Sequence, residues 1–293
     1  MRSLLFVPAD SEKKLQRALG VGADVLILDL EDSVAPARKA LARQIAADFI
    51  RDHRNTVAAR LYVRVNALAS GMTDDDLVAV MPAAPAGIML PKATGGQDVT
   101  LLSVKLRVHE AECNLEDGTT RILPIVTETA AAVFAAGTYA GSSARLAGLT
   151  WGAEDLSAEI GARTARDERG RYTDVFALAR ATTLLAASAA AVPAVDTVFP
   201  AFRDENGFAR ECIEAERDGF TAKMAIHPAQ VPVINAAFTP SAQAVAEARR
   251  VVSAFTEAGD TGVASLDGAM IDRPHLLRAE RVIARAKLAG LDE

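Results

Sequence analysis

Two carboxylates in the middle of the chain each follow a run of apolar residues. Glu128 stands just after residues 122–126, and Asp155 follows residues 146–151 across a short Gly-Ala-Glu segment. Each run is expected to form a buried strand. Neighbouring parallel strands that end in this way can direct two carboxylates into one pocket, and carboxylate oxygens suit a hard cation such as Mg²⁺. The spacing therefore predicts a magnesium site on Glu128 and Asp155.

Other polar side chains stand at the predicted ends of the remaining strands. A single one usually caps a helix or closes a salt bridge, but several carboxylates that converge repel each other unless a cation neutralises them. Arg64 lies inside the strand-like run Leu-Tyr-Val-Arg-Val-Asn, where a charge is costly unless it faces a partner or a ligand. Its planar fork suits a substrate carboxylate. The full set is Asp29, Glu31, Asp32, Arg64, Asn66, Lys92, Glu128, Asp155 and His227.

Some of these residues allow more than one interpretation. The small-residue turn Gly152-Ala153-Glu154 could offer free N–H groups to a substrate carboxylate, and an ordinary strand–helix turn explains it equally well. Glu154 itself is expected to be a loop or cap residue. Lys92 leaves a Schiff-base mechanism open. His227, beside a proline, is expected to be a hydrogen-bonded structural residue.

Strand-like and helix-like segments alternate along the chain, in the manner of a (β/α)₈ barrel. Eight such units within about 235 residues match the count and size of that fold, and a doubly wound sheet is the alternative. The predicted strands cover residues 3–7, 24–30, 60–66, 87–90, 122–126, 146–151, 194–199 and 221–226. The predicted helices cover residues 10–19, 35–51, 73–81, 98–111, 129–139, 174–191 and 205–218.

We expect one structural domain, with an α/β barrel over residues 1–238 and a C-terminal helical extension over residues 239–293. Within the extension, helices are predicted for residues 241–258 and 273–288. The segment between them, residues 259–270, contains three glycines and is expected to be a flexible connection. The extension could serve as a lid or as an oligomerisation arm.

Composition excludes several classes of protein. A net charge of −6 argues against a nucleic-acid surface. Two cysteines make no disulfide framework and fit a reducing cytoplasm. The first residues lack the apolar stretch of a signal peptide, and the longest weakly polar run, residues 184–195, is too short to span a bilayer. We therefore expect a cytoplasmic protein without membrane contact.

A series of motifs runs through nearly the whole chain and resembles one known family. The chain is similar to the HpcH/HpaI aldolase and citrate lyase beta-subunit family, in its CitE-like and malyl-CoA lyase branch. The Leu-Asp-Leu-Glu-Asp run and the tail motif make the resemblance specific. In chain order, the motifs are Arg-Ser-Leu-Leu-Phe-Val-Pro from Arg2, Leu-Asp-Leu-Glu-Asp-Ser-Val from Leu28, Arg-Val-Asn from Arg64, Leu-Pro-Lys from Leu90, Glu128-Thr129, Gly-Ala-Glu-Asp-Leu from Gly152, Ile-His-Pro from Ile226 and Met-Ile-Asp-Arg-Pro from Met270.

The resemblance implies a TIM barrel with Mg²⁺, or Mn²⁺ as a substitute, on Glu128 and Asp155. It implies that Arg64 holds substrate and stabilises an enolate, while Glu31 and Asp32 hold the waters around the metal.

The resemblance further implies that Asp272 is a general base. A helix N-cap ahead of Pro274 is the alternative role of this residue. Phe6 and Arg17 fall where relatives contact the CoA side of the site. A homotrimer is also implied, sometimes paired into a hexamer, in which the C-terminal segment covers a neighbour's site.

The activity implied is Mg²⁺-dependent cleavage or formation of a carbon–carbon bond in a 3-hydroxyacyl-CoA. Malyl-CoA or citramalyl-CoA would give acetyl-CoA and a 2-oxo acid, glyoxylate or pyruvate. One alternative is a pyruvate aldolase that acts on free hydroxy-oxo acids. Another is a citrate lyase beta subunit that acts on a citryl-acyl-carrier thioester within a complex. The tail with Asp272 favours the first activity, because the short aldolases lack this lid.

Overall fold

The computed structural model describes residues 1–259 and 262–291. The chain forms two compact units, Met1–Asn235 and Ala236–Glu293, and each is described by itself. The single structural domain expected from the sequence stays a prediction. None of the described helices is long and apolar enough to cross a membrane.

Eight parallel strands form the sheet of the first unit, in the order β5-β4-β3-β2-β1-β8-β7-β6. β1 pairs with β8, and β5 meets β6 through isolated parallel bridges, Ile122 to Leu146 and Ile125 to Thr150. The sheet is therefore a near-closed TIM-like barrel, as predicted, and the doubly wound alternative is excluded. The strands are β1 (Ser3–Pro8), β2 (Val25–Asp29), β3 (Arg60–Arg64), β4 (Gly87–Leu90), β5 (Arg121–Pro124), β6 (Leu149–Thr150), β7 (Ala194–Asp196) and β8 (Ala222–Ala225).

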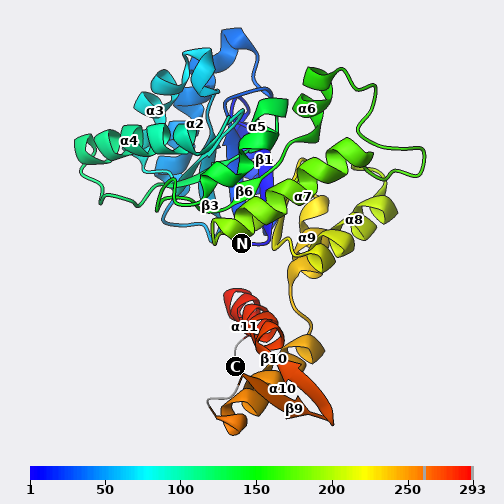
Figure 1. Cartoon of the computed structure of the whole chain (residues 1–293). Coiled ribbons are helices and arrows are strands. Elements are labelled where there is room, and N and C mark those ends of the chain that lie inside the picture. The colour runs from blue at the N-terminus through cyan, green and yellow to red at the C-terminus, as the bar shows by residue number, and fades with distance from the viewer. Residues whose placement is uncertain (260–261, 292–293) are drawn as a thin grey trace. The chain divides into compact units, whose positions relative to one another are not determined.

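Helices follow the strands and surround the sheet (Figure 1). The α-helices are α1 (Glu12–Ala18), α2 (Lys39–His53), α3 (Thr73–Val80), α4 (Gly96–Glu112), α5 (Ala130–Ala135), α6 (Ala153–Ile160), α7 (Asp174–Ala189), α8 (Glu205–Asp218) and α9 (Gln230–Phe238). Short 3₁₀ turns are η1 (Pro36–Arg38), η2 (Leu68–Ser70), η3 (Met81–Ala83) and η4 (Ala136–Tyr139). Helices α6 and α9 have no counterpart among the predicted helices, and α9 contains Pro232. Proline is tolerated there since it lies in the first turn.

Side chains from the strands fill the inside of the barrel. Leu4, Ile27, Tyr62, Leu123 and Val195 belong to one buried cluster with residues of β4 and β8. Packing is close, since a Cβ added at Gly87 would lie 2.5 Å from the Tyr62 ring. A barrel filled in this way is not a pore, so ligands bind at the carboxyl ends of its strands.

The second unit contains α10 (Ala242–Ala258), α11 (Arg273–Leu288) and an antiparallel hairpin of β9 (Val263–Leu266) and β10 (Ala269–Asp272). Phe255, Ala264 and Ile271 form its buried cluster. The flexible connection predicted for residues 259–270 is therefore wrong over the hairpin, while residues 260 and 261 lie outside the described part. Asp267 and Gly268 both have positive φ, 53° and 81°, and an Asp-Gly pair of this kind is a strong hairpin signal.

Candidate active site

The two carboxylates predicted as metal ligands lie at the carboxyl ends of β5 and β6. Glu128 is 2% exposed, and one of its oxygens accepts the backbone N–H of Lys92. Asp155 lies in the first turn of α6 with a side chain that is 33% exposed. Gly152 is the N-cap of α6, and a Cβ added there would lie 2.8 Å from Cγ of Glu128. Only glycine therefore lets the start of α6 approach Glu128 this closely.

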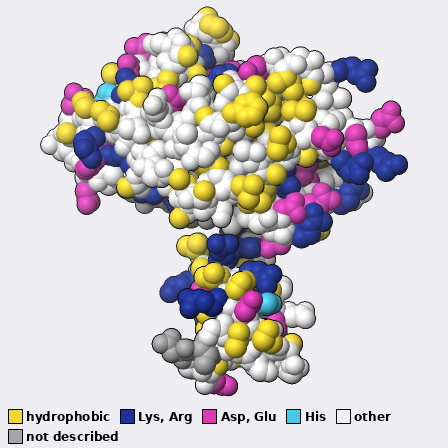
Figure 2. Space-filling model, viewed as in Figure 1, with side chains coloured by type: hydrophobic (Ala, Val, Ile, Leu, Met, Phe, Trp, Pro, Cys, Tyr) yellow, Lys and Arg dark blue, Asp and Glu magenta, His cyan; other side chains and the backbone are white. Residues whose placement is uncertain are grey.

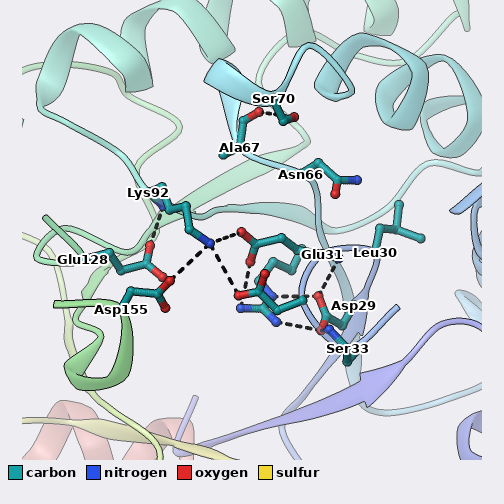
Figure 3. A network of polar contacts seen from close by, with 12 residues as sticks. Asp29, Leu30, Glu31, Ser33, Asn66, Ala67, Ser70, Lys92, Glu128 and Asp155 are labelled. Atoms are coloured by element: carbon teal, nitrogen blue, oxygen red, sulfur yellow. Dashed lines mark hydrogen bonds and ion pairs between the residues drawn. The ribbon is translucent and has the colours of Figure 1, made fainter. Parts of the chain in front are cut away.

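Lys92 connects both carboxylates with the loop after β2. Its Nζ lies 2.5 Å from Oε1 of Glu31, 3.3 Å from Oδ1 of Asp155 and 3.4 Å from Oδ2 of Asp32 (Figure 3). The residue has φ of 52°, a strained conformation of the kind that clusters at functional sites. Burial alone would lower the pKa of Lys92, but Glu31, Asp155 and Glu128 raise it above its usual value. A Schiff-base lysine needs the opposite shift, so the geometry disfavours that alternative.

Arg64 is held by a carboxylate to which the sequence assigned no role. Its Nε and Nη2 donate to the two oxygens of Asp29 at 2.7 and 2.6 Å, and its Nη1 lies 3.0 Å from Oε2 of Glu31. The guanidinium also lies over the Phe6 ring, 4.8 Å from its centroid. Asp29 and Arg64 are direct partners in the β2–β3 register. Their pairing could have been inferred only if that register had been known.

The loop that carries Glu31 and Asp32 is fixed by Lys39 of α2. Its Nζ donates to the carbonyls of Leu30 and Glu31 at 2.6 and 2.8 Å and to the side chain of Asn66 at 2.7 Å. Glu31 is 5% exposed, and burial raises its pKa despite Arg64 and Lys92. Its Oε2 forms an ion pair with Arg64 but accepts no hydrogen bond of good geometry. Glu31 and Asp32 thus lie beside the two predicted ligands.

The remaining predicted residues lie in different places. Ala153 is buried and Glu154 is exposed at the start of α6. Phe6 lies at the site under Arg64, as described above, whereas Arg17 is exposed in the last turn of α1. A substrate carboxylate on the turn at Gly152, and CoA contacts of Phe6 and Arg17, stay predictions.

Asp272 belongs to the second unit, where it is the N-cap of α11. Its Oδ1 lies 2.5 Å from Nδ1 of His275, and this hydrogen bond lowers the pKa of Asp272. The capping role weighed from the sequence is present, because the side chains of Asp272 and His275 form a capping box with the backbone at the start of α11. The catalytic role stays a prediction.

The residues at the mouth fit a magnesium ion. Among the described residues no group of three or more His, Cys, Asp or Glu side chains has a metal-binding arrangement, but Mg²⁺ usually takes one or two carboxylates and completes its shell with water and substrate. Five carboxylates (Asp29, Glu31, Asp32, Glu128 and Asp155) share two cations, Arg64 and Lys92, in this cluster. An additional cation would offset their repulsion.

Magnesium affinity is expected to rise with pH up to about pH 8. Burial raises the pKa of Glu128 to about 8, with Asp155 and Glu31 adding to the rise. A proton must therefore leave before a cation can bind, which costs up to about tenfold in affinity per pH unit below that pKa. Titration calorimetry at several pH values checks this, and an affinity that does not change between about pH 6 and 8 would contradict it.

A cavity of about 1080 Å³ is lined by none of the residues of this cluster. It is lined by residues of α6, α7 and α8 and of the loop between α6 and α7, such as Ser157, Arg163, Arg180 and Arg210. We place the site at the carboxylates instead, because convergent groups with shifted pKa values mark active sites better than volume alone.

Comparisons with known proteins identify relatives over nearly the whole chain. Residues 2–228 match the profile of the HpcH/HpaI aldolase/citrate lyase family. The chain is 35% identical to citrate lyase subunit beta of Escherichia coli K12 over 294 residues, which cover 100% of this chain and 95% of that protein. It is 31% identical to the mitochondrial citramalyl-CoA lyase of Rattus norvegicus, over 97% of this chain and 86% of that protein. The crystal structure of the protein CitE from Mycobacterium tuberculosis in complex with magnesium, acetoacetate and coenzyme A matches with a TM-score of 0.76 and 34% identity, over 98% of each chain.

Proposed function

The chain belongs to the HpcH/HpaI aldolase/citrate lyase family and is an oxo-acid lyase of that family, and from this we propose that it cleaves or forms a 3-hydroxyacyl-CoA with Mg²⁺. The substrate class is that of malyl-CoA or citramalyl-CoA, and the products are acetyl-CoA and glyoxylate or pyruvate. The observation that carries the proposal is the cluster at the mouth of the barrel, in which Lys92 contacts Glu128 and Asp155 and is joined to Arg64 through Glu31. The CitE structure with magnesium, acetoacetate and coenzyme A supports it.

Arg64 would stabilise the negative charge that develops on the substrate during the reaction. Cleavage removes the hydroxyl proton, breaks the carbon–carbon bond and leaves the acetyl thioester as an enolate. Because Asp29 fixes two of its nitrogens, the guanidinium is oriented before substrate arrives, and preorganised charge of this kind stabilises an oxyanion efficiently.

Other groups would hold the 2-oxo acid and move protons. Glu128 and Asp155 would hold Mg²⁺, which would supply Lewis acidity for the substrate hydroxyl oxygen that becomes the oxo group of the product. The N–H groups after Gly152, at the start of α6, would receive the substrate carboxylate. Asp272 would return a proton to the enolate carbon in cleavage and remove one in condensation.

The direct test is to incubate the purified protein with malyl-CoA and with citramalyl-CoA, with Mg²⁺ and after removal of metal by EDTA. Cleavage that EDTA abolishes and Mg²⁺ or Mn²⁺ restores is expected. Cleavage of free hydroxy-oxo acids alone would favour the aldolase. A protein that ignores CoA thioesters but cleaves a citryl-acyl-carrier thioester would favour a citrate lyase subunit.

Arg64→Lys is expected to lower kcat by roughly 10²–10³, the usual loss when a fixed oxyanion contact is removed. Lysine keeps the charge but cannot pair with both oxygens of Asp29 while it faces substrate. Steady-state kinetics with the substrate identified above check this. Arg2→Lys is the matched control, because Arg2 also donates through two nitrogens to both oxygens of an aspartate, Asp24, but at the amino ends of β1 and β2. Kinetics unchanged in Arg64→Lys would return Arg64 to a structural role.

We also propose that the protein assembles with copies of itself, as a trimer or a pair of trimers. Apolar side chains gather over α5 and α7 on the surface (Figure 2). Phe134 is 92% exposed, and Leu178 and Leu185 are 61% and 70% exposed. Exposed apolar side chains gathered in this way often mark protein interfaces, and sedimentation of the purified protein measures the assembly.

A further inference from the structure

Six side chains form a closed ring of contacts between the sheet and the helices outside it. Trp151 Nε1 donates to Oδ1 of Asp196 at 2.8 Å, and Lys223 Nζ donates to Oδ2 of Asp196 at 2.9 Å and to Oε1 of Glu211 at 2.8 Å. Arg166 Nη2 lies 2.7 Å from Oε2 of Glu211 and 2.6 Å from the hydroxyl of Tyr172. The Tyr172 ring closes the circuit edge-on against Trp151, with centroids 4.9 Å apart.

The ring lies beside the least regular part of the barrel. β6 contains two residues and joins β5 through isolated bridges. Thr150 pairs with Val195, so the next residues along, Trp151 and Asp196, extend the β6–β7 register through their side chains. Asp196 in turn is the register partner of Lys223 on β8. The ring therefore ties the end of β6 to two better-paired strands.

Most charged members of the ring are buried and therefore need partners. Trp151, Asp196 and Lys223 are each 0% exposed. Burial alone would raise the pKa of Asp196, but Lys223 and Arg180 hold it below its usual value. Burial alone would lower the pKa of Lys223, and Asp196 and Glu211 raise it instead. A buried ion pair adds little net stability compared with apolar packing, but it fixes geometry where each group is hydrogen-bonded.

The ring ends next to both carboxylates of the candidate site. Gly152 follows Trp151 directly and lies against the Glu128 side chain. Asp155 is in the first turn of α6, which begins at the next residue, Ala153. A shift of Trp151 would therefore move the backbone that packs on Glu128 and the helix that carries Asp155.

We propose that Asp196, Lys223, Glu211 and Arg166 are positioning residues that act through Trp151 to hold Glu128 and Asp155 in place for a divalent cation. The inference rests on the proposed function for the identity of the cation. Arg166 comes from the loop between α6 and α7, so this loop helps to position the site through Arg166.

The test compares two arginine substitutions. Arg166→Met opens the ring at its partly exposed member, whose side chain is 22% exposed. Arg145→Met is the matched control, because Arg145 also pairs with a buried glutamate, Glu110, and is only 4% exposed. The carbonyl of Arg145 accepts the N–H of Ile122, so this pair lies at the other end of β5 and β6. The control should therefore lower stability at least as much.

Mg²⁺ affinity, measured by calorimetry, and fluorescence of the chain's single tryptophan are the readouts. Arg166→Met should weaken Mg²⁺ binding about tenfold or more, as loss of a supporting contact commonly does, and should shift the Trp151 emission. Arg145→Met should leave both unchanged and lower only the melting temperature. Trp151→Phe, which keeps an aromatic ring but removes the N–H and part of the buried ring volume, should weaken Mg²⁺ binding in the same way.

Three results would overturn the inference. The first is that Arg166→Met and Trp151→Phe bind Mg²⁺ as tightly as the wild type does. The second is that Arg145→Met weakens Mg²⁺ binding as much as Arg166→Met does, because the loss of affinity would then reflect general stability. A wild-type protein that binds no divalent cation would overturn the proposed function as well, and that outcome is distinct from the other two. If Trp151→Phe fails to fold, the comparison of Mg²⁺ affinity between Arg166→Met and Arg145→Met is sufficient to test the inference.

Discussion

Glu128→Gln and Asp155→Asn are each expected to lower kcat/KM by on the order of 10³ or more while the protein stays folded. Each change removes one charged ligand from a site with two, and a catalytic metal commonly contributes several kcal/mol to transition-state stabilisation. The fold is expected to survive. In the absence of metal, burial raises the pKa of Glu128 to about 8, so its carboxyl group is readily protonated. Glutamine is a close replacement for the protonated acid.

Glu154→Gln is the matched control for this experiment. Glu154 is the neighbour of Asp155 in the first turn of α6 and is exposed, so its loss should leave activity near that of wild type. Calorimetric titration with Mg²⁺ and circular dichroism separate metal loss from unfolding. Normal Mg²⁺ affinity in both ligand variants would show that the metal lies elsewhere.

Asp272→Asn is expected to lower turnover by roughly 10²–10⁴, the usual contribution of a general base. The hydrogen bond with His275 lowers the pKa of Asp272 and keeps it ionised, as a base must be. Asparagine caps a helix about as well as aspartate, so melting temperature and Mg²⁺ affinity should stay near the wild-type values. The variant should also lose exchange of the methyl protons of acetyl-CoA with deuterated water, which proton NMR follows.

Glu280→Gln, an exposed change on the same helix α11, is the control for Asp272→Asn and should keep the exchange reaction. Mixing Asp272→Asn with Glu128→Gln subunits tests whether the C-terminal segment serves a neighbouring subunit. Recovered activity is expected if it does. A mixture that stays inactive despite proven subunit exchange would show that Asp272 serves its own chain, and normal turnover of Asp272→Asn would leave it a cap alone.

Local pattern was sufficient for the elements whose ends carry strong signals. β4 (Gly87–Leu90), α8 (Glu205–Asp218) and α11 (Arg273–Leu288) begin and end at the residues predicted. α8 stops at Gly219, which has φ of 115°, and α11 begins after the cap Asp272. β6 is shorter than predicted, because its regular pairing depends on strands that are distant in sequence.

The sequence by itself determined the alternation of eight strands with helices, and it put Glu128 and Asp155 at the ends of neighbouring strands. These properties follow from apolar periodicity and from the rule that barrel chemistry lies at the carboxyl ends of strands. Only the tertiary structure decided which charges meet: Asp29 with the Arg64 fork, Lys92 among four carboxylates, and Lys223 between Asp196 and Glu211. The physical reason is that such pairs depend on strand register and helix placement, which bring together residues that are far apart in the chain and that no local pattern connects.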